Sequence, residues 1–312
     1  MQLKQALTSA ISRLTADRVP SPRMNAEALL KFVLSCDRAY LYAHSERELS
    51  PDETARYDAA LAERARGVPA QYITGHQEFW GMDLIVSSAV LIPRPETEHV
   101  IETVLQLVSE VSGQISHAPS ASSVPHKDHE GRKGTQRNTT GESGSGLRIL
   151  DVGTGSGCIA LALAAELPEA EIHATDISPA ALEIARANAA RHQLESRIEF
   201  HHVDLLHGFD ENTFDFVVSN PPYVGESEED QVQLEVRKFE PRMAVFAGPT
   251  GLEVIARLLP QARATLKRGG WLVMEISGGI AAAVPSLLSD WADVRVTNDL
   301  QGIPRVAAAQ KP

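Results

Sequence analysis

One short stretch presents polar groups in a constrained geometry that suits the binding of a planar nitrogen. It follows a largely apolar run at positions 214–218, which predicts a buried strand, and it consists of Asn220, Pro221, Pro222 and Tyr223. Because a residue before proline is driven into an extended backbone, we expect Asn220 at the carboxyl end of that strand. Open α/β sheets bind their ligands at this end.

The groups in this stretch match an –NH2 group of an amide or of an exocyclic base amine. The Asn220 side chain and the Pro221 carbonyl offer acceptor oxygens, and Tyr223 offers an aromatic wall. Such a nitrogen is a poor nucleophile because its lone pair is delocalised. Accepting both of its hydrogens holds it in place and directs lone-pair density at an electrophile. From these four residues alone, the alternative of a simple turn stays open.

A second stretch predicts the binding site of the molecule that carries the electrophile. It lies between an expected strand at 147–152 and an expected helix at 158–167, and it consists of Gly153, Thr154, Gly155, Ser156 and Gly157. This G-x-G-x-G spacing fits neither the nicotinamide fingerprint nor the Walker pattern. Asp151, just before the turn, disfavours a pyrophosphate and favours a cationic ligand. S-adenosylmethionine carries an ammonium and a sulfonium and no phosphate.

Acidic residues close the next two expected strands. Asp176 follows the strand at 172–175, where its carboxylate is placed to accept hydrogen bonds from ribose hydroxyls. Asp204 and Leu205 follow the strand at 198–203, where they are placed for adenine. Asp176 alone could instead belong to a helix N-terminus. Together with the glycine turn and the Asn-Pro-Pro-Tyr stretch, however, these residues predict a site for S-adenosylmethionine.

The rest of the chain divides into regions of different pattern. From Leu147 onward, alternating strands and helices predict a parallel sheet. Before it, helical periodicity and a capping box at Ser50 and Glu53 predict a small helical bundle. We therefore expect a substrate-recognition bundle at 1–75, a β-hairpin (78–92) with its connecting helix within 76–111, a disordered insertion at 112–146, and the catalytic domain at 147–312. The bundle as a merely stabilising appendage is the alternative.

Two polar segments between these regions need an interpretation of their own. Arg94 lies between two prolines in residues 93–98, which suggests a lid or hinge that faces the site, or else a turn with solvated charges. Thr97 is expected to cap the helix that follows. The insertion carries His117, His126 and His129, which lack organised spacing, so no metal site is predicted there.

Composition excludes several classes of protein. The net charge of −12 and a pI of about 5.4 argue against bulk nucleic acid as the main partner, which needs a basic surface. Two cysteines in 312 residues form no framework, which is typical of a reducing compartment. No apolar run reaches the length of a membrane span. We expect a cytoplasmic protein.

At these motifs the sequence resembles a known family. Asp151–Gly157 and Asn220–Tyr223 resemble class I S-adenosylmethionine-dependent methyltransferases that act on amide or amino nitrogens. Leu91–Glu98 and the Glu240-Pro241-Arg242 string narrow the resemblance to the HemK/PrmC release factor glutamine methyltransferases, over nearly the whole chain except 112–146. It implies an α/β fold: a Rossmann-like class I methyltransferase domain with a mostly parallel seven-stranded sheet, and a small N-terminal helical bundle joined by a β-hairpin.

The resemblance also implies an activity and roles for residues. The family methylates the side-chain nitrogen of the glutamine in the Gly-Gly-Gln motif of class 1 peptide chain release factors, giving N5-methylglutamine. Carried over, Gly153–Gly157 would surround the methionine part of S-adenosylmethionine, Asp176 would hold the ribose, and Leu205 would flank adenine. Asn220 would contact both cofactor and substrate. The remaining substrate-side residues would be Pro221, Pro222, Tyr223 and Arg94.

The sequence departs from the pattern of this family at some positions, and alternative functions stay open. Some members have an aromatic residue where Leu205 stands, and residues 278–281 replace a glutamine that often follows the acid of the fifth strand. A DNA adenine methyltransferase acting on a flipped base would present the same Asn-Pro-Pro-Tyr stretch, although the acidic balance opposes it. A non-catalytic cofactor-binding scaffold is the other alternative. We expect a monomer with no direct nucleic-acid partner, no membrane partner and no metal.

Overall fold

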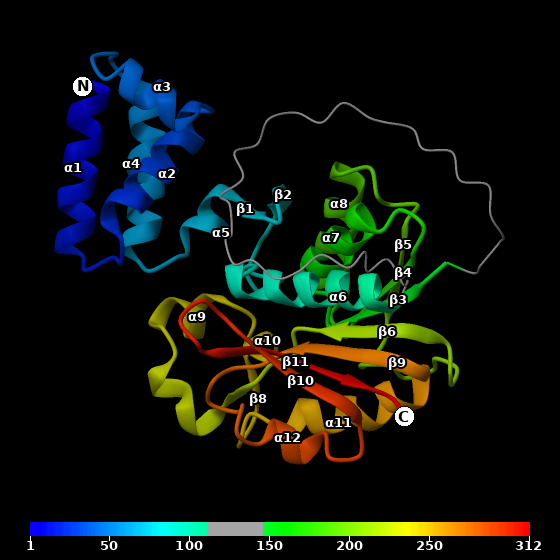
Figure 1. The fold of residues 1–312 in the computed structure, drawn as a ribbon. Helices are drawn as coiled ribbons and strands as arrows, with labels where there is room; N and C mark the ends of the chain where they lie inside the picture. The colour runs from blue at the N-terminus through cyan, green and yellow to red at the C-terminus, as the bar shows by residue number, and fades with distance from the viewer. Residues whose placement is uncertain (112–145) are drawn as a thin grey trace, which may run out of the picture.

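The computed structural model describes residues 1–111 and 146–312, which form a helical bundle and a larger sheet domain (Figure 1). The predicted insertion at 112–146 and its three histidines lie outside the described residues, except for Gly146. None of the helices in the described ranges has both the length and the apolar character needed to span a bilayer.

The N-terminal bundle packs apolar stripes of its helices against one another. Its helices are α1 (Leu3–Ala16), α2 (Pro22–Leu34), α3 (Arg38–Ala43), α4 (Pro51–Ala65) and α5 (Ala70–Thr74). The predicted capping box starts α4: the Glu53 amide donates to Ser50 Oγ at 3.1 Å, and the Ser50 amide donates to Glu53 Oε2 at 2.9 Å. Tyr57 lies at the centre of the core and donates to the carbonyl of Ala26.

A short hairpin and a long helix connect the bundle to the sheet. The hairpin consists of β1 (His76–Phe79) and β2 (Met82–Ile85) in antiparallel register. The prediction of a hairpin reaching residue 92 was wrong, because Trp80 and Gly81 both adopt positive φ and close a two-residue turn. Residues 86–94 follow without a strand, and η1 (Pro95–Thr97) leads into α6 (Glu98–Val111).

The sheet has seven strands in the order β10-β11-β9-β6-β3-β4-β5. The five from β9 to β5 are parallel, and β11 runs antiparallel between β10 and β9. The bounds are β3 (Arg148–Val152), β4 (Glu171–Asp176), β5 (Ile198–His202), β6 (Phe214–Ser219), β9 (Leu266–Glu275), β10 (Ala292–Asn298) and β11 (Pro304–Gln310). Strand order reverses between β3 and β6, which opens a crevice at their carboxyl ends.

Helices cover both faces of this sheet, as Figure 1 shows. Helices α6, α7 (Cys158–Glu166) and α8 (Pro179–Arg191) lie over one face, and α11 (Glu253–Thr265) and α12 (Val284–Leu287) lie over the other. Alternate side chains of β6 enter opposite cores: Phe216 and Val218 on the first face, Val217 on the second. Burial on both faces explains the nearly continuous apolar run before Asn220.

Short elements follow β6 and complete the rim of the crevice. They are β7 (Val224–Gly225), η2 (Glu226–Gln231), α9 (Leu234–Phe239), α10 (Arg242–Val245) and β8 (Phe246–Gly248). Strand β7 pairs with β8 in a separate two-stranded sheet. The bundle contacts this region where the buried Arg64 guanidinium donates to Glu235 Oε2 at 2.7 Å.

Candidate functional site

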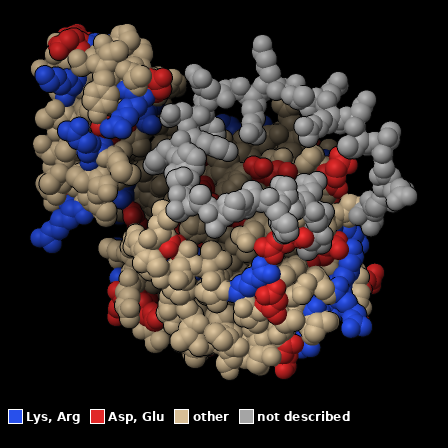
Figure 2. Space-filling view, in the orientation of Figure 1, with Lys and Arg blue, Asp and Glu red and all other residues tan. Residues whose placement is uncertain are grey.

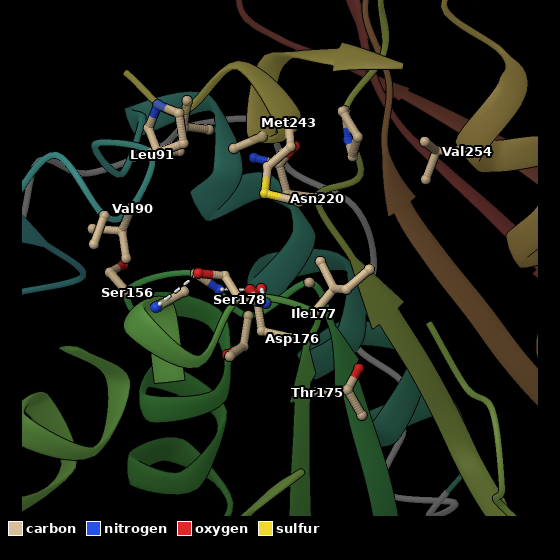
Figure 3. A pocket seen from close by; sticks show the side chains of 18 of the residues that line it. Val90, Leu91, Ser156, Thr175, Asp176, Ile177, Ser178, Asn220, Met243 and Val254 are labelled. Atoms are coloured by element: carbon tan, nitrogen blue, oxygen red, sulfur yellow. Dashed lines mark hydrogen bonds between the residues drawn. The ribbon is translucent and has the colours of Figure 1, made fainter. Parts of the chain in front are cut away.

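A cavity of about 490 Å³ opens at the carboxyl ends of the parallel strands. The glycine turn after β3, the acid that ends β4 and the stretch after β6 all contribute to its wall. In Figure 3, Asp176 and Ser178 lie on one side of the cavity and Asn220 and Met243 on the other. The predicted site residues that line it are Gly153, Thr154, Gly155, Ser156, Asp176, Leu205, Asn220 and Pro222.

The glycine turn is held by backbone bonds and leaves open space in front of it. The amides of Gly153 and Thr154 both donate to the carbonyl of Thr175, at 2.9 and 2.8 Å. Gly153 and Gly155 have positive φ, and a Cβ on either would meet no atom within 4 Å. Gly157 differs because a Cβ there would lie 2.9 Å from the Leu161 side chain, so its role is close helix packing and it does not line the cavity.

Asp176 is fixed by backbone donors on both of its oxygens. The Gly155 amide donates to Oδ2 at 2.9 Å and the Ser178 amide donates to Oδ1 at 2.8 Å. Burial raises the pKa of Asp176 above its ordinary value, and the amide bonds oppose this rise. A carboxylate has about four acceptor positions, so two remain for hydroxyls of a ligand.

Asp151 does not face the cavity, which differs from its predicted role toward a cationic ligand. It is buried behind the turn, where its Oδ2 accepts from Thr154 Oγ1 at 2.6 Å and from the Ala160 amide at 3.2 Å. Its Oδ1 is buried and has no hydrogen-bond partner among the described residues. Burial raises the pKa of Asp151 to about 7. The Asp151 carboxyl therefore stabilises the glycine turn from the side that faces away from the cavity.

A chain of side-chain hydrogen bonds fixes the amide of Asn220. Its Nδ2 donates to Thr97 Oγ1 at 3.1 Å, and Thr97 Oγ1 donates to Glu275 Oε2 at 2.6 Å. The other oxygen of Glu275 accepts from the Tyr223 hydroxyl at 2.9 Å. Thr97 and Glu275 are 1% and 2% exposed, so water does not compete for these bonds. Because Nδ2 is engaged, Asn220 keeps Oδ1 as a free acceptor.

Two of the predicted site residues, Pro221 and Tyr223, lie behind the cavity wall. Tyr223 donates to Glu275 and does not line the cavity, and burial raises the pKa of its hydroxyl. Pro221 is buried and does not line it either, whereas its neighbour Pro222 does. Thr97 was predicted to cap α6, but its hydroxyl donates to Glu275 instead, so that prediction was wrong.

Arg94 forms an ion pair outside the cavity. Its guanidinium donates to Glu240 Oε1, and the Ile92 amide donates to Glu240 Oε2 at 3.1 Å. Glu240 is buried, and Arg94 is partly exposed and does not line the cavity. The Glu240 carboxylate thus joins two segments that are distant in the sequence, residues 91–98 and 240–242. Pro93 and Thr97 of the first segment line the cavity.

Sequence reasoning missed Glu275 as a site residue and misread Thr97. A carboxylate at the end of the buried run 271–276 was the available signal for Glu275, because a lone acid in a buried strand needs partners. Nothing in the spacing pointed to its partners, which come from η1 and from the loop that follows β6. The apolar lining from Val90, Leu91, Met243 and Val254, visible in Figure 3, was also not predicted.

These observations fit S-adenosylmethionine as the ligand. The open space above Gly153 and Gly155 admits a group close to the backbone, and Asp176 has free acceptor positions for ribose hydroxyls. Leu205 lines the cavity on the side reached from β5, with φ +53°. The Asp176 carboxylate in this part of the cavity wall disfavours a ligand with a phosphate, and S-adenosylmethionine has none.

Comparison with known proteins supports the interpretation that this cavity binds S-adenosylmethionine. Residues 5–75 match a family model described as the PrmC N-terminal domain, and residues 139–238 match one described as the methyltransferase small domain. The release factor glutamine methyltransferase of Koribacter versatilis is 52% identical over 313 residues, which cover 100% of this chain and 99% of that protein. The protein of the same name from Xylella fastidiosa is 38% identical, covering 98% of this chain and 99% of that protein.

A solved structure extends the likeness to the fold. The hMettl16 catalytic domain in complex with a MAT2A 3′UTR hairpin is 17% identical, with a TM-score of 0.53 over 81% of this chain and 82% of that chain. The predicted class I methyltransferase fold, with its mostly parallel seven-stranded sheet and N-terminal helices, is confirmed. The chain is an S-adenosylmethionine-dependent methyltransferase and belongs to the release factor glutamine methyltransferase family.

Proposed function

We propose that this protein transfers a methyl group from S-adenosylmethionine to the side-chain amide nitrogen of the glutamine in the Gly-Gly-Gln motif of class 1 peptide chain release factors. The product is N5-methylglutamine. The observation that carries this proposal is the single cavity that joins the glycine turn to Asn220. The names of the relatives support the choice of a release factor as substrate.

The residues of the chain act by positioning the acceptor amide. The bound cofactor supplies an activated, electrophilic methyl group. Asn220, which lines the cavity, accepts one hydrogen of the glutamine –NH2 through Oδ1, and Thr97 keeps the Asn220 amide from rotating. The Pro221 carbonyl, predicted as the second acceptor, does not line the cavity and is not given this role. Pro222, Leu91 and Met243 form an apolar wall that excludes water beside the nitrogen. Orientation of this kind is worth roughly 7–11 kcal/mol of barrier.

The N-terminal bundle is the part of the chain that we assign to recognition of the release factor. Residues 1–75 contain ten Lys and Arg and nine Asp and Glu, against a net charge of −12 for the whole chain. Figure 2 shows Lys and Arg gathered on this face of the bundle, whereas both signs are interspersed over the face of the sheet domain. Release factors act on ribosomes, so we place the enzyme in the cytoplasm. We also propose that it acts as a monomer without nucleic acid or membrane as partner.

Mass spectrometry of a release factor tests this function. After incubation with the enzyme and S-adenosylmethionine, the peptide that contains the Gly-Gly-Gln motif should carry one added methyl group on the glutamine. A release factor with that glutamine replaced by glutamate is the matched control, because it lacks the acceptor nitrogen. Double-stranded DNA with labelled cofactor belongs in a parallel reaction. Methylated DNA and an unmodified release factor would overturn the proposal in favour of an adenine methyltransferase.

A further inference from the structure

Two histidines and a glutamate stand together on the outer strands of the sheet. His173 lies on β4, and Glu199 and His201 lie on β5, with His173 beside Glu199 and Thr175 beside His201 in the parallel register. Residues at every second position of a strand share a face, so the three side chains lie on the same side of the sheet. None of the three lines the cavity, and the methyl transfer uses none of them.

The distances within this cluster match those among the ligands of a metal ion. His173 Nδ1 lies 3.0 Å from His201 Nε2, and the two oxygens of Glu199 each lie 3.6 Å from one of these nitrogens. Ligand atoms at the corners of a tetrahedral zinc site lie ~3.3 Å apart, because the bonds to zinc are about 2.0–2.2 Å long. The ligand atoms of the three side chains all lie within 4.8 Å of one another, close enough to contact one common ion after a small movement of the exposed Glu199 side chain.

A second carboxylate orients His173 as it would in a metal site. His173 Nε2 lies 2.8 Å from Glu171 Oε1, and Arg148 donates to both oxygens of Glu171, at 3.1 and 3.0 Å. A carboxylate that accepts from one ring nitrogen keeps the proton there and leaves the lone pair of the other nitrogen for a metal. Here that lone pair belongs to Nδ1, which faces His201. Arg148 Nη2 also lies 3.4 Å from His173 Nε2.

Aromatic side chains hold the two imidazoles on the inner side of the cluster. Phe214 contacts His173 edge-on at 5.2 Å between ring centroids, and Phe209 contacts His201 at 5.0 Å. The side chain of Glu199 is 67% exposed, which leaves the outer side open to solvent and to an arriving ion.

We propose that His173, Glu199 and His201 bind a zinc ion that links β4 to β5. Solvent would take the fourth position, and Glu171 would act as the carboxylate that orients His173. The two strands lead to Asp176 and to Leu205, which line the cavity. The ion would therefore stabilise the outer edge of the cofactor end of the site. A plain hydrogen bond between two neutral histidines accounts for the 3.0 Å distance equally well but predicts no zinc affinity.

Zinc binding by the full-length protein without an affinity tag tests this proposal. Titration with Zn²⁺ alone, followed by calorimetry, should give one equivalent for the wild type. His201→Asn and Glu199→Gln should lose this binding, and Glu171→Gln should weaken it roughly 10- to 100-fold. His202→Asn is the matched control, because His202 is adjacent on β5 and its side chain contacts the Ile177 carbonyl instead. This variant should bind zinc as the wild type does.

A second control separates this cluster from the histidines of the insertion. A variant with His117, His126 and His129 replaced by asparagine should keep the zinc equivalent. Zinc should raise the melting temperature of the wild type and of this triple variant but not that of Glu199→Gln. Since Glu199 is exposed, that variant should fold even if His201→Asn does not. Wild-type protein without bound zinc, unchanged binding in Glu199→Gln, or loss of binding in the triple variant would each overturn the proposal.

Discussion

The two ends of the cavity are built in different ways. At the cofactor end, Asp176 and the glycine turn are fixed by backbone amides from positions within about one strand–turn–helix unit. At the acceptor end, Asn220 is fixed by side chains that lie more than 50 residues away in either direction, Thr97 and Glu275. The cofactor end is therefore a local construction, and the acceptor end is assembled only by the complete fold.

This difference has a consequence for how each end responds to substitution. A local backbone bond survives most changes of side chain, so damage at the cofactor end should appear as weaker cofactor binding. The acceptor end depends on a buried relay in which each member has a single partner on each side. Damage there should appear in the rate of transfer, with cofactor affinity unchanged. Cofactor affinity and the rate of transfer, measured separately, therefore distinguish the two ends.

The largest effect is expected for Asn220→Ala. Loss of a preorganised polar group at a reacting centre typically lowers kcat by roughly 10²–10³-fold, and we expect a loss of this size. Steady-state kinetics on a release factor gives kcat, and calorimetry gives the cofactor affinity, which should stay within about threefold of wild type. A variant with wild-type turnover would show that Asn220 does not orient the acceptor.

At the cofactor end, Asp176→Ala should weaken the binding of S-adenosylmethionine and change kcat little. Loss of hydrogen bonds to a charged group costs about 1.5–3 kcal/mol, so the Kd for S-adenosylmethionine should rise roughly 10- to 100-fold. At saturating cofactor, kcat should recover most of its wild-type value. Asp176→Asn is the milder variant, because it keeps one of the two oxygens that accept from the backbone amides and replaces the other with a donor, so its Kd should lie between those of wild type and Asp176→Ala. A large fall in kcat at saturation would mean that the two ends are not separable.

A smaller effect is expected for Thr97→Val, which keeps the shape of the side chain and removes its hydroxyl. Asn220 then loses the acceptor for Nδ2 and Glu275 loses a donor, so kcat should fall roughly tenfold. Thr97→Ser restores the hydroxyl and should restore most of the rate. If valine and serine give the same kcat, the relay does not orient Asn220.

The same comparison explains what the sequence could and could not predict. The parallel sheet, the glycine turn and Asp176 follow from periodicity and short motifs, because their contacts are local. The stretch Asn220–Tyr223 was visible because diproline restricts the backbone. The roles of Thr97 and Glu275 depend on contacts among η1, the end of β9 and the loop that follows β6, and no local spacing encodes these contacts. Arg94 was singled out between its prolines, but its partner Glu240 lies 146 residues away.

The last effect is one on stability and not on rate, and it concerns the buried carboxyl beneath the glycine turn. The pKa of Asp151 is about 7 in the folded protein, against an ordinary value of 3.8. Between these values the folded state binds more protons than the unfolded state, so this group makes the free energy of unfolding fall as pH rises from about 4 to about 7. Asp151→Asn removes the titration and keeps an oxygen that can accept from Thr154 and from the Ala160 amide.

The difference in unfolding free energy between wild type and Asp151→Asn should therefore change with pH in one direction. Relative to the variant, the wild type should become progressively less stable across that interval and change little above it. Denaturant unfolding of both proteins at matched pH values measures this difference, in which the titrations of all other groups cancel to first order. Two parallel curves would mean that Asp151 is already ionised in the folded state. The free Oδ1 would then need a partner, such as a bound cation or water, and the cofactor end would rest on more than its backbone bonds.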